Sequence, residues 1–80
     1  MESGYIGHFS NRGDIEITVK ALNAEYPNVK FSLWETEGKG LDLFVSSLYG
    51  RTISYETMIN FKNNAWILYK SIPIIKEHVK

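Results

Sequence analysis

Hydrophobic and polar side chains alternate along two neighbouring stretches in the middle of the chain. The first runs from Val29 to Glu37 and the second from Leu41 to Ser47, with Gly38-Lys39-Gly40 between them. Two alternating runs around a short glycine-containing loop predict a β-hairpin.

The alternation also predicts how the two strands are aligned. A three-residue loop, 38–40, places Leu33 opposite Val45 and Trp34 opposite Phe44, whereas a two-residue loop would pair Trp34 with Leu43 and mix the faces. We therefore expect the three-residue loop, with Gly40 in the left-handed conformation. One face then carries Val29, Phe31, Leu33, Leu41, Leu43 and Val45, and the other Lys30, Ser32, Trp34, Thr36, Asp42, Phe44 and Ser46.

The N-terminal part predicts a strand and then a helix. In the strand 4–9, Tyr5, Gly7 and Phe9 should point to one side, and Ile6 and His8 to the core side. Residues 15–25 fit both an amphipathic helix and an alternating strand. We interpret them as a helix that starts at Ser10, Asn11 or Asp14 and stops before Pro27-Asn28.

The C-terminal part is open to two interpretations. Ser54 is a suitable N-cap for a helix with Tyr55, Met58, Ile59 and Phe61 on its apolar face. Asn63-Asn64 would end that helix, and residues 65–70 would form a buried strand. Pro73 would then begin a short terminal helix, with Ile74, Ile75 and Val79 on its apolar side. The alternative is one long helix from Ser54 to Ser71.

The predicted order of elements indicates a single α+β domain over residues 1–80. It is a ferredoxin-like βαββαβ arrangement with an antiparallel sheet, helices on one face and a short C-terminal helix. The other face would be open, unless the terminal helix packs over it. The candidate binding residues on this face are Tyr5, Phe9, Lys30, Trp34 and Phe44.

Two short stretches resemble the RNA recognition motif family. Gly4-Tyr5-Ile6-Gly7-His8-Phe9 is similar to the first-strand hexamer of that family, with Tyr5 in the base-stacking position. Lys39-Gly40 matches the start of the third-strand octamer, although Leu41 and Leu43 stand where the family has aromatic residues and Asp42 replaces a small one. The resemblance implies binding of single-stranded RNA on the sheet face.

Composition and charge narrow the functional classes. The chain has no cysteine and its net charge is zero, so we expect neither a disulfide framework nor the basic face of a duplex-DNA binder. Residues 1–50 hold four Lys/Arg against seven Asp/Glu, and residues 51–80 hold five against two. No apolar run could span a membrane and the first residues lack a signal sequence, which predicts a cytoplasmic protein.

The candidate chemistry favours binding over catalysis. His8 and His78 do not form a metal pair, Glu35 and Glu37 lack a third ligand, and no nucleophile pattern is present, so we expect no enzyme, cofactor or metal. We predict a non-enzymatic protein-binding module, such as an inhibitor or adaptor of a phage or mobile element. The alternatives are single-stranded nucleic-acid binding through the aromatic face and helix-turn-helix-like DNA binding around residues 53–64, which needs a helix over 41–48.

Overall fold

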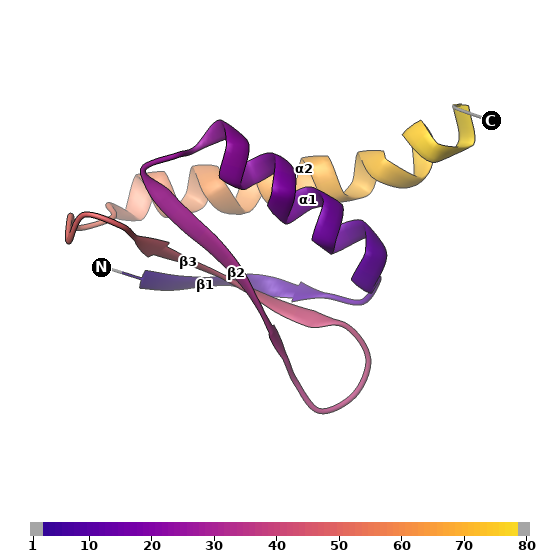
Figure 1. The fold of residues 1–80 in the computed structure, drawn as a ribbon, viewed down its shortest axis with the longest axis horizontal. Coiled ribbons are helices and arrows are strands. Elements are labelled where there is room, and N and C mark those ends of the chain that lie inside the picture. Colours follow the sequence, from indigo (N-terminus) through magenta and orange to yellow (C-terminus); the bar gives the residue numbers. More distant parts are fainter. Residues whose placement is uncertain (1–2, 79–80) are drawn as a thin grey trace.

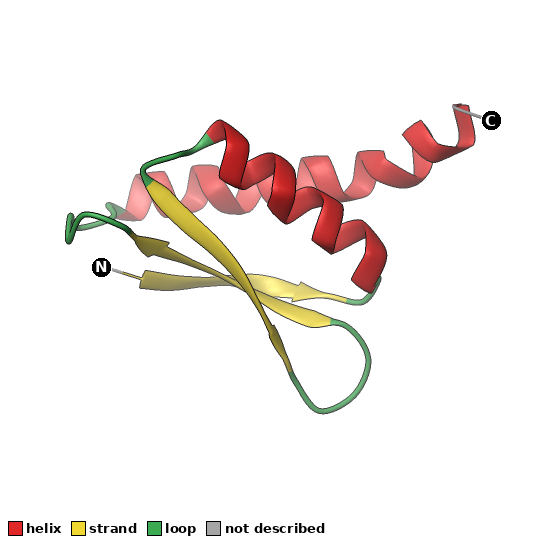
Figure 2. Ribbon diagram, in the orientation of Figure 1, coloured by secondary structure: helices red, strands yellow, loops and turns green. Residues whose placement is uncertain are grey.

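Three strands and two helices make up the part of the chain that the computed structural model describes, residues 3–78. The elements are β1 (Ser3–Phe9), α1 (Arg12–Glu25), β2 (Val29–Glu35), β3 (Leu41–Ser47) and α2 (Tyr55–His78). The sheet order is β1-β3-β2, and β3 is antiparallel to both neighbours. Both helices lie on the same side of the sheet (Figures 1 and 2). The α+β class is therefore confirmed.

The first helix begins and ends close to where the sequence predicts. Asn11 caps α1, because its side-chain oxygen accepts a hydrogen bond from the backbone N–H of Asp14 at 3.0 Å. The helical interpretation of residues 15–25 is thus confirmed. Ser54 does the same for α2, since its hydroxyl accepts from the N–H of Thr57 at 3.1 Å.

The predicted fourth strand over residues 65–70 is wrong, because these residues belong to α2. The buried residues of α2, Met58, Phe61, Ala65 and Ile72, recur at helical spacing. Asn64 does not end the helix, and its side chain donates to the hydroxyl of Tyr26 at 2.6 Å. Pro73 lies inside α2, so no separate C-terminal helix begins there. Val79 lies outside the described residues.

The hairpin faces are sorted as predicted, but the register is wrong by two residues. Leu33 pairs with Leu43, and Trp34 pairs with Asp42. Residues 36–40 therefore form the loop, which is longer than the expected 38–40. A shift of two residues keeps every side chain on its own face, because the side-chain period of a strand is two.

A β-bulge in β1 corrects the expected positions of Phe9 and His8. Tyr5 pairs with Phe44, but the next pair is Gly7 with Leu43, so Ile6 is the extra residue. Beyond the bulge the alternation is reversed. Phe9 is buried on the helix side, whereas His8 lies opposite Asp42 on the other face.

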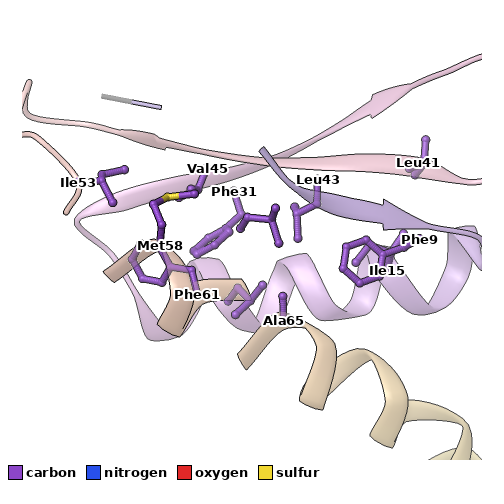
Figure 3. Close-up of a cluster of buried hydrophobic side chains, with 12 residues drawn as sticks. Phe9, Ile15, Phe31, Leu41, Leu43, Val45, Ile53, Met58, Phe61 and Ala65 are labelled. Carbon is purple, nitrogen blue, oxygen red and sulfur yellow. The ribbon is translucent and has the colours of Figure 1, made fainter. Parts of the chain in front are cut away.

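The core fills the space between the sheet and the helices. Figure 3 shows Met58, Phe61 and Ala65 on the same side of the sheet as Val45 and Phe31. The rings of Phe31 and Phe61 lie 5.3 Å apart, centroid to centroid. At the other end, Lys76 of α2 binds the buried carboxylate of Asp14 at 2.6 Å. The core thus occupies one side of the sheet, and neither helix covers the opposite face.

Candidate functional site

Three aromatic side chains form a cluster on the sheet face opposite the helices, here called the open face. Phe44 is half-buried in its centre, with the ring of Tyr5 at 5.3 Å and the ring of Trp34 at 6.5 Å, centroid to centroid. Trp34 is 63% exposed and Tyr5 is 54% exposed. Each strand contributes one ring, so the cluster crosses the whole sheet.

Four of the five predicted site residues lie on this face. Tyr5, Trp34 and Phe44 form the cluster. The exposed Lys30 lies opposite Ser46, two residues along the strands from the pair of Ser32 and Phe44. Phe9 does not belong to the site, because the bulge turns it into the core. The alternative in which a terminal helix packs over the aromatic residues is not realised, since α2 packs on the opposite side of the sheet (Figure 1).

A shallow hollow lies beside the aromatic cluster. It has a volume of about 420 Å³. Trp34 and Phe44 form its aromatic side, and its other lining residues are Ser3, Ser32, Val45 and Ser46. The serines carry short side chains, so this part of the face is lower than the rings. The hollow combines apolar ring surface with hydroxyl groups that can donate or accept hydrogen bonds.

Sequence reasoning missed a polar group on the open face, formed by His8 and Asp42, the latter being the pair partner of Trp34. Nδ1 of His8 contacts Oδ1 of Asp42 at 2.9 Å, and Nε2 of His8 contacts the backbone oxygen of Lys39 at 2.8 Å. Both partners are acceptors, and a neutral imidazole has one N–H, so both contacts are hydrogen bonds when His8 is an imidazolium. No pattern in the sequence indicated this group, since the bulge places His8 on the face.

The hydroxyl of Tyr5 is expected to ionise later than an ordinary tyrosine. Partial desolvation, the negative charge of Asp42 and the hydrogen bond that Tyr5 donates to Asp42 at 3.4 Å all raise its pKa. The usual pKa of tyrosine is near 10. An ultraviolet absorbance titration should therefore show one tyrosine whose pKa lies above that value. Any stability that this shift provides is present at pH values below the usual pKa and is lost as the pH rises through the raised pKa.

The variant Asp42→Asn tests the assignment, because it removes the negative charge. The late-titrating tyrosine should then ionise nearer the usual pH. A late transition that persists in Asp42→Asn but disappears in Tyr5→Phe would show that Asp42 does not contribute to the shift.

A larger cleft lies away from the aromatic cluster. It has a volume of about 890 Å³ and lies between the α1–β2 turn and the start of α2, with Tyr26, Tyr49, Arg51 and Ile53 among its lining residues. The hydroxyl of Ser54 donates to the hydroxyl of Thr57 at 2.8 Å, so these groups already bind each other. Residues 3–78 contain no group of three or more His, Asp or Glu side chains that could hold a metal ion.

The helix-turn-helix alternative loses its structural basis. The helix-turn-helix interpretation of residues 53–64 needs a helix over 41–48, and the chain forms strand β3 there. Among the described residues, neither helix has the length and apolar character that crossing a membrane requires.

Comparisons of the chain with family models, with curated proteins and with solved structures found no match.

Proposed function

We propose that this chain is a non-enzymatic protein-binding module and that the open face is its binding surface. The observation that supports the proposal is the exposure of Trp34, 63% of whose surface is accessible on a sheet face that neither helix covers. Contiguous exposed apolar surface on a small protein commonly marks an interaction site. Tryptophan and tyrosine are also the side chains most enriched among residues that dominate binding energy.

The shape of the open face suits a partner that inserts one side chain. The hollow beside Trp34 and Phe44 can accept an apolar or aromatic group against the two rings. Ser32 and Ser46, in neighbouring strands, can hydrogen-bond to polar groups around the inserted side chain. An anchor of this kind in a partly apolar hollow, surrounded by polar groups, is typical of protein–protein recognition.

Single-stranded nucleic acid is the competing ligand, because three rings on a sheet face could also stack bases. The charges on the open face favour a protein. Lys30 is the lysine that the three strands contribute to this face, and Asp42 places a carboxylate close to Tyr5 and Phe44. A strand of phosphates needs a positively charged groove, which these strands do not provide.

Replacing Trp34 with alanine should weaken partner binding by about 2 kcal/mol or more, which is roughly thirtyfold in the dissociation constant. The melting temperature should change little, because an exposed ring loses little packing when it is truncated. The partner is first isolated by a nuclease-treated pull-down with mass spectrometry. Its affinity is then measured by calorimetry with wild type and Trp34→Ala.

Tyr49→Ala is the matched control, because Tyr49 is 69% exposed and lies outside the three strands. It should bind the partner as tightly as wild type. Equal weakening by both substitutions would contradict the proposed surface. Binding of a mixed oligonucleotide pool at micromolar affinity, with a steep dependence on salt, would instead establish the nucleic-acid alternative.

A further inference from the structure

The two outer edges of the sheet differ in how their backbone groups are occupied. On β2, the side chain of Asn23 in α1 binds the backbone of Phe31 twice. Asn23 donates to the carbonyl oxygen of Phe31 at 3.1 Å and accepts from its N–H at 2.8 Å. An amide side chain thus takes the place of a neighbouring strand, and this blocks strand addition at β2. The described part of the chain places no strand beyond β1.

The direction of the free backbone groups on β1 follows from the same contact. Phe31 directs its N–H and C=O away from β3, so its pair partner Val45 directs its own groups toward β1. Gly4, which pairs with Val45, therefore bonds to β3. By alternation, Tyr5 directs its N–H and C=O outward. Beyond the bulge, Gly7 pairs with Leu43, whose N–H and C=O point toward β1, so Gly7 bonds to β3. The N–H and C=O of the next residue, His8, therefore point outward.

Helix α2 packs against β1 on one flank and against the end of α1 on the other. The two outer strands of a three-stranded sheet are about 10 Å apart, and two packed helices need a similar separation. Trp66 packs against Phe9 of β1, with ring centroids 4.2 Å apart. On the other flank of α2, Phe61 and Asn64 contact Tyr26 at the end of α1. The flank of α2 away from α1 therefore lies beside the free edge of β1.

This outer flank of α2 is aromatic and basic. Its residues recur at intervals of three or four along the helix, and they are Tyr55, Ile59, Lys62, Trp66 and Lys70. Lys70 places its ammonium 5.8 Å from the centre of the Trp66 ring. Neither Lys62 nor Lys70 forms an ion pair within residues 3–78, whereas Lys76 is bound by Asp14. Strand β1 contains no Asp or Glu.

We propose that the edge of β1 and the outer flank of α2 together bind an extended, acidic segment of a partner protein as an additional strand. The backbone of β1 supplies hydrogen bonds to the segment, and alternate side chains of the segment face α2. Acidic side chains among these meet Lys62 and Lys70, and apolar ones meet Ile59 and Trp66. A second copy of this chain fits less well, because it would bring the same two lysines to the contact.

Tyr5 of β1 is shared with the aromatic cluster, but Trp34 lies on β2 at the opposite edge of the sheet. The two surfaces can therefore be tested separately. The test is a selection from a displayed library of random peptides roughly ten residues long, which is longer than the seven residues of β1. The wild-type chain, Lys62→Glu/Lys70→Glu and Trp34→Ala are used in parallel as targets.

The wild-type chain should select peptides in which acidic residues alternate with β-branched or aromatic ones. The synthesised best peptide should bind the double charge-reversal variant at least about tenfold more weakly, and Trp34→Ala with unchanged affinity. On binding, the amide hydrogen of Tyr5 or His8 should become protected from exchange. Circular dichroism of the double variant should match wild type, because both lysines are exposed.

The proposal would be overturned if the wild-type chain selected no consensus or a non-acidic one. It would also be overturned by undiminished binding of the peptide to the charge-reversal variant, or by exchange protection that spares β1. Tighter binding of a thymidine oligonucleotide than of the selected peptide would also overturn it. Loss of peptide binding in Trp34→Ala alone would assign the peptide to the open face, which would support the proposed function and refute this second surface.

Discussion

Replacing Phe9 with alanine should lower the free energy of unfolding by about 3–5 kcal/mol, as deletion of a core aromatic ring does. Phe9 is 1% exposed. Its ring lies 4.2 Å from the ring of Trp66 and 4.8 Å from the ring of Tyr69, centroid to centroid. Truncation would leave a cavity between β1 and α2 that these large rings could fill only in part. Urea denaturation followed by circular dichroism measures the loss.

Tyr5→Ala is the matched control for Phe9→Ala, because the two aromatic residues belong to the same strand. Tyr5 is largely exposed and has one ring neighbour, Phe44, so its removal should cost about 1 kcal/mol. A larger loss for Tyr5→Ala than for Phe9→Ala would place Phe9 on the open face. The pairing across the bulge would then be wrong.

The bulge shows what the sequence could not reveal about β1. Strict alternation puts Tyr5 and Phe9 on the same face, and it fails because Ile6 is an extra residue between the pairs Tyr5–Phe44 and Gly7–Leu43. A bulge leaves no signal in a six-residue pattern that contains two glycines. It removes Phe9 from the candidate site, and it adds His8 with its contacts to Asp42 and Lys39.

The sequence predicts which residues of the hairpin share a face, but it does not predict which residues pair across the two strands. Burial of Phe31, Leu43 and Val45 follows from their alternation with polar residues. The same sorting results from any register that differs by two residues, so the hydrophobic pattern could not choose between Phe44 and Asp42 as the partner of Trp34. The loop length makes that choice, and it depends on contacts that the loop makes outside the hairpin.

The second half of the chain contained a signal that the prediction misread. Residues 65–69 form a short apolar run, which strands and buried helices share. The spacing of Met58, Phe61 and Ala65 continues to Ile72 and favours one helix. Asn63 and Asn64 are poor helix formers, but helix propensity is a weak preference that tertiary contacts override. The contact of Asn64 with Tyr26 is such a contact.

Gly40→Ala is the second substitution with a large expected effect, about 3 kcal/mol or more in the free energy of unfolding. Gly40 has φ +92°, where a side chain is strained. A β-carbon at this position would also lie 2.3 Å from the backbone oxygen of Phe9 and 2.8 Å from Cα of Ser10. These are backbone atoms at the junction of β1 and α1, so they cannot move aside as a flexible side chain could.

Gly38→Ala separates the clash from the backbone strain. Gly38 has φ +98° in the same loop, but a β-carbon there would have no atom within 4 Å. We expect it to cost about 1–2 kcal/mol, from strain alone. Paired urea denaturation curves give the difference between the two variants. Equal losses would mean that the loop does not rest against Phe9 and Ser10, whereas a clearly larger loss for Gly40→Ala shows that the end of β1 fixes the hairpin loop and, with it, the partner of Trp34.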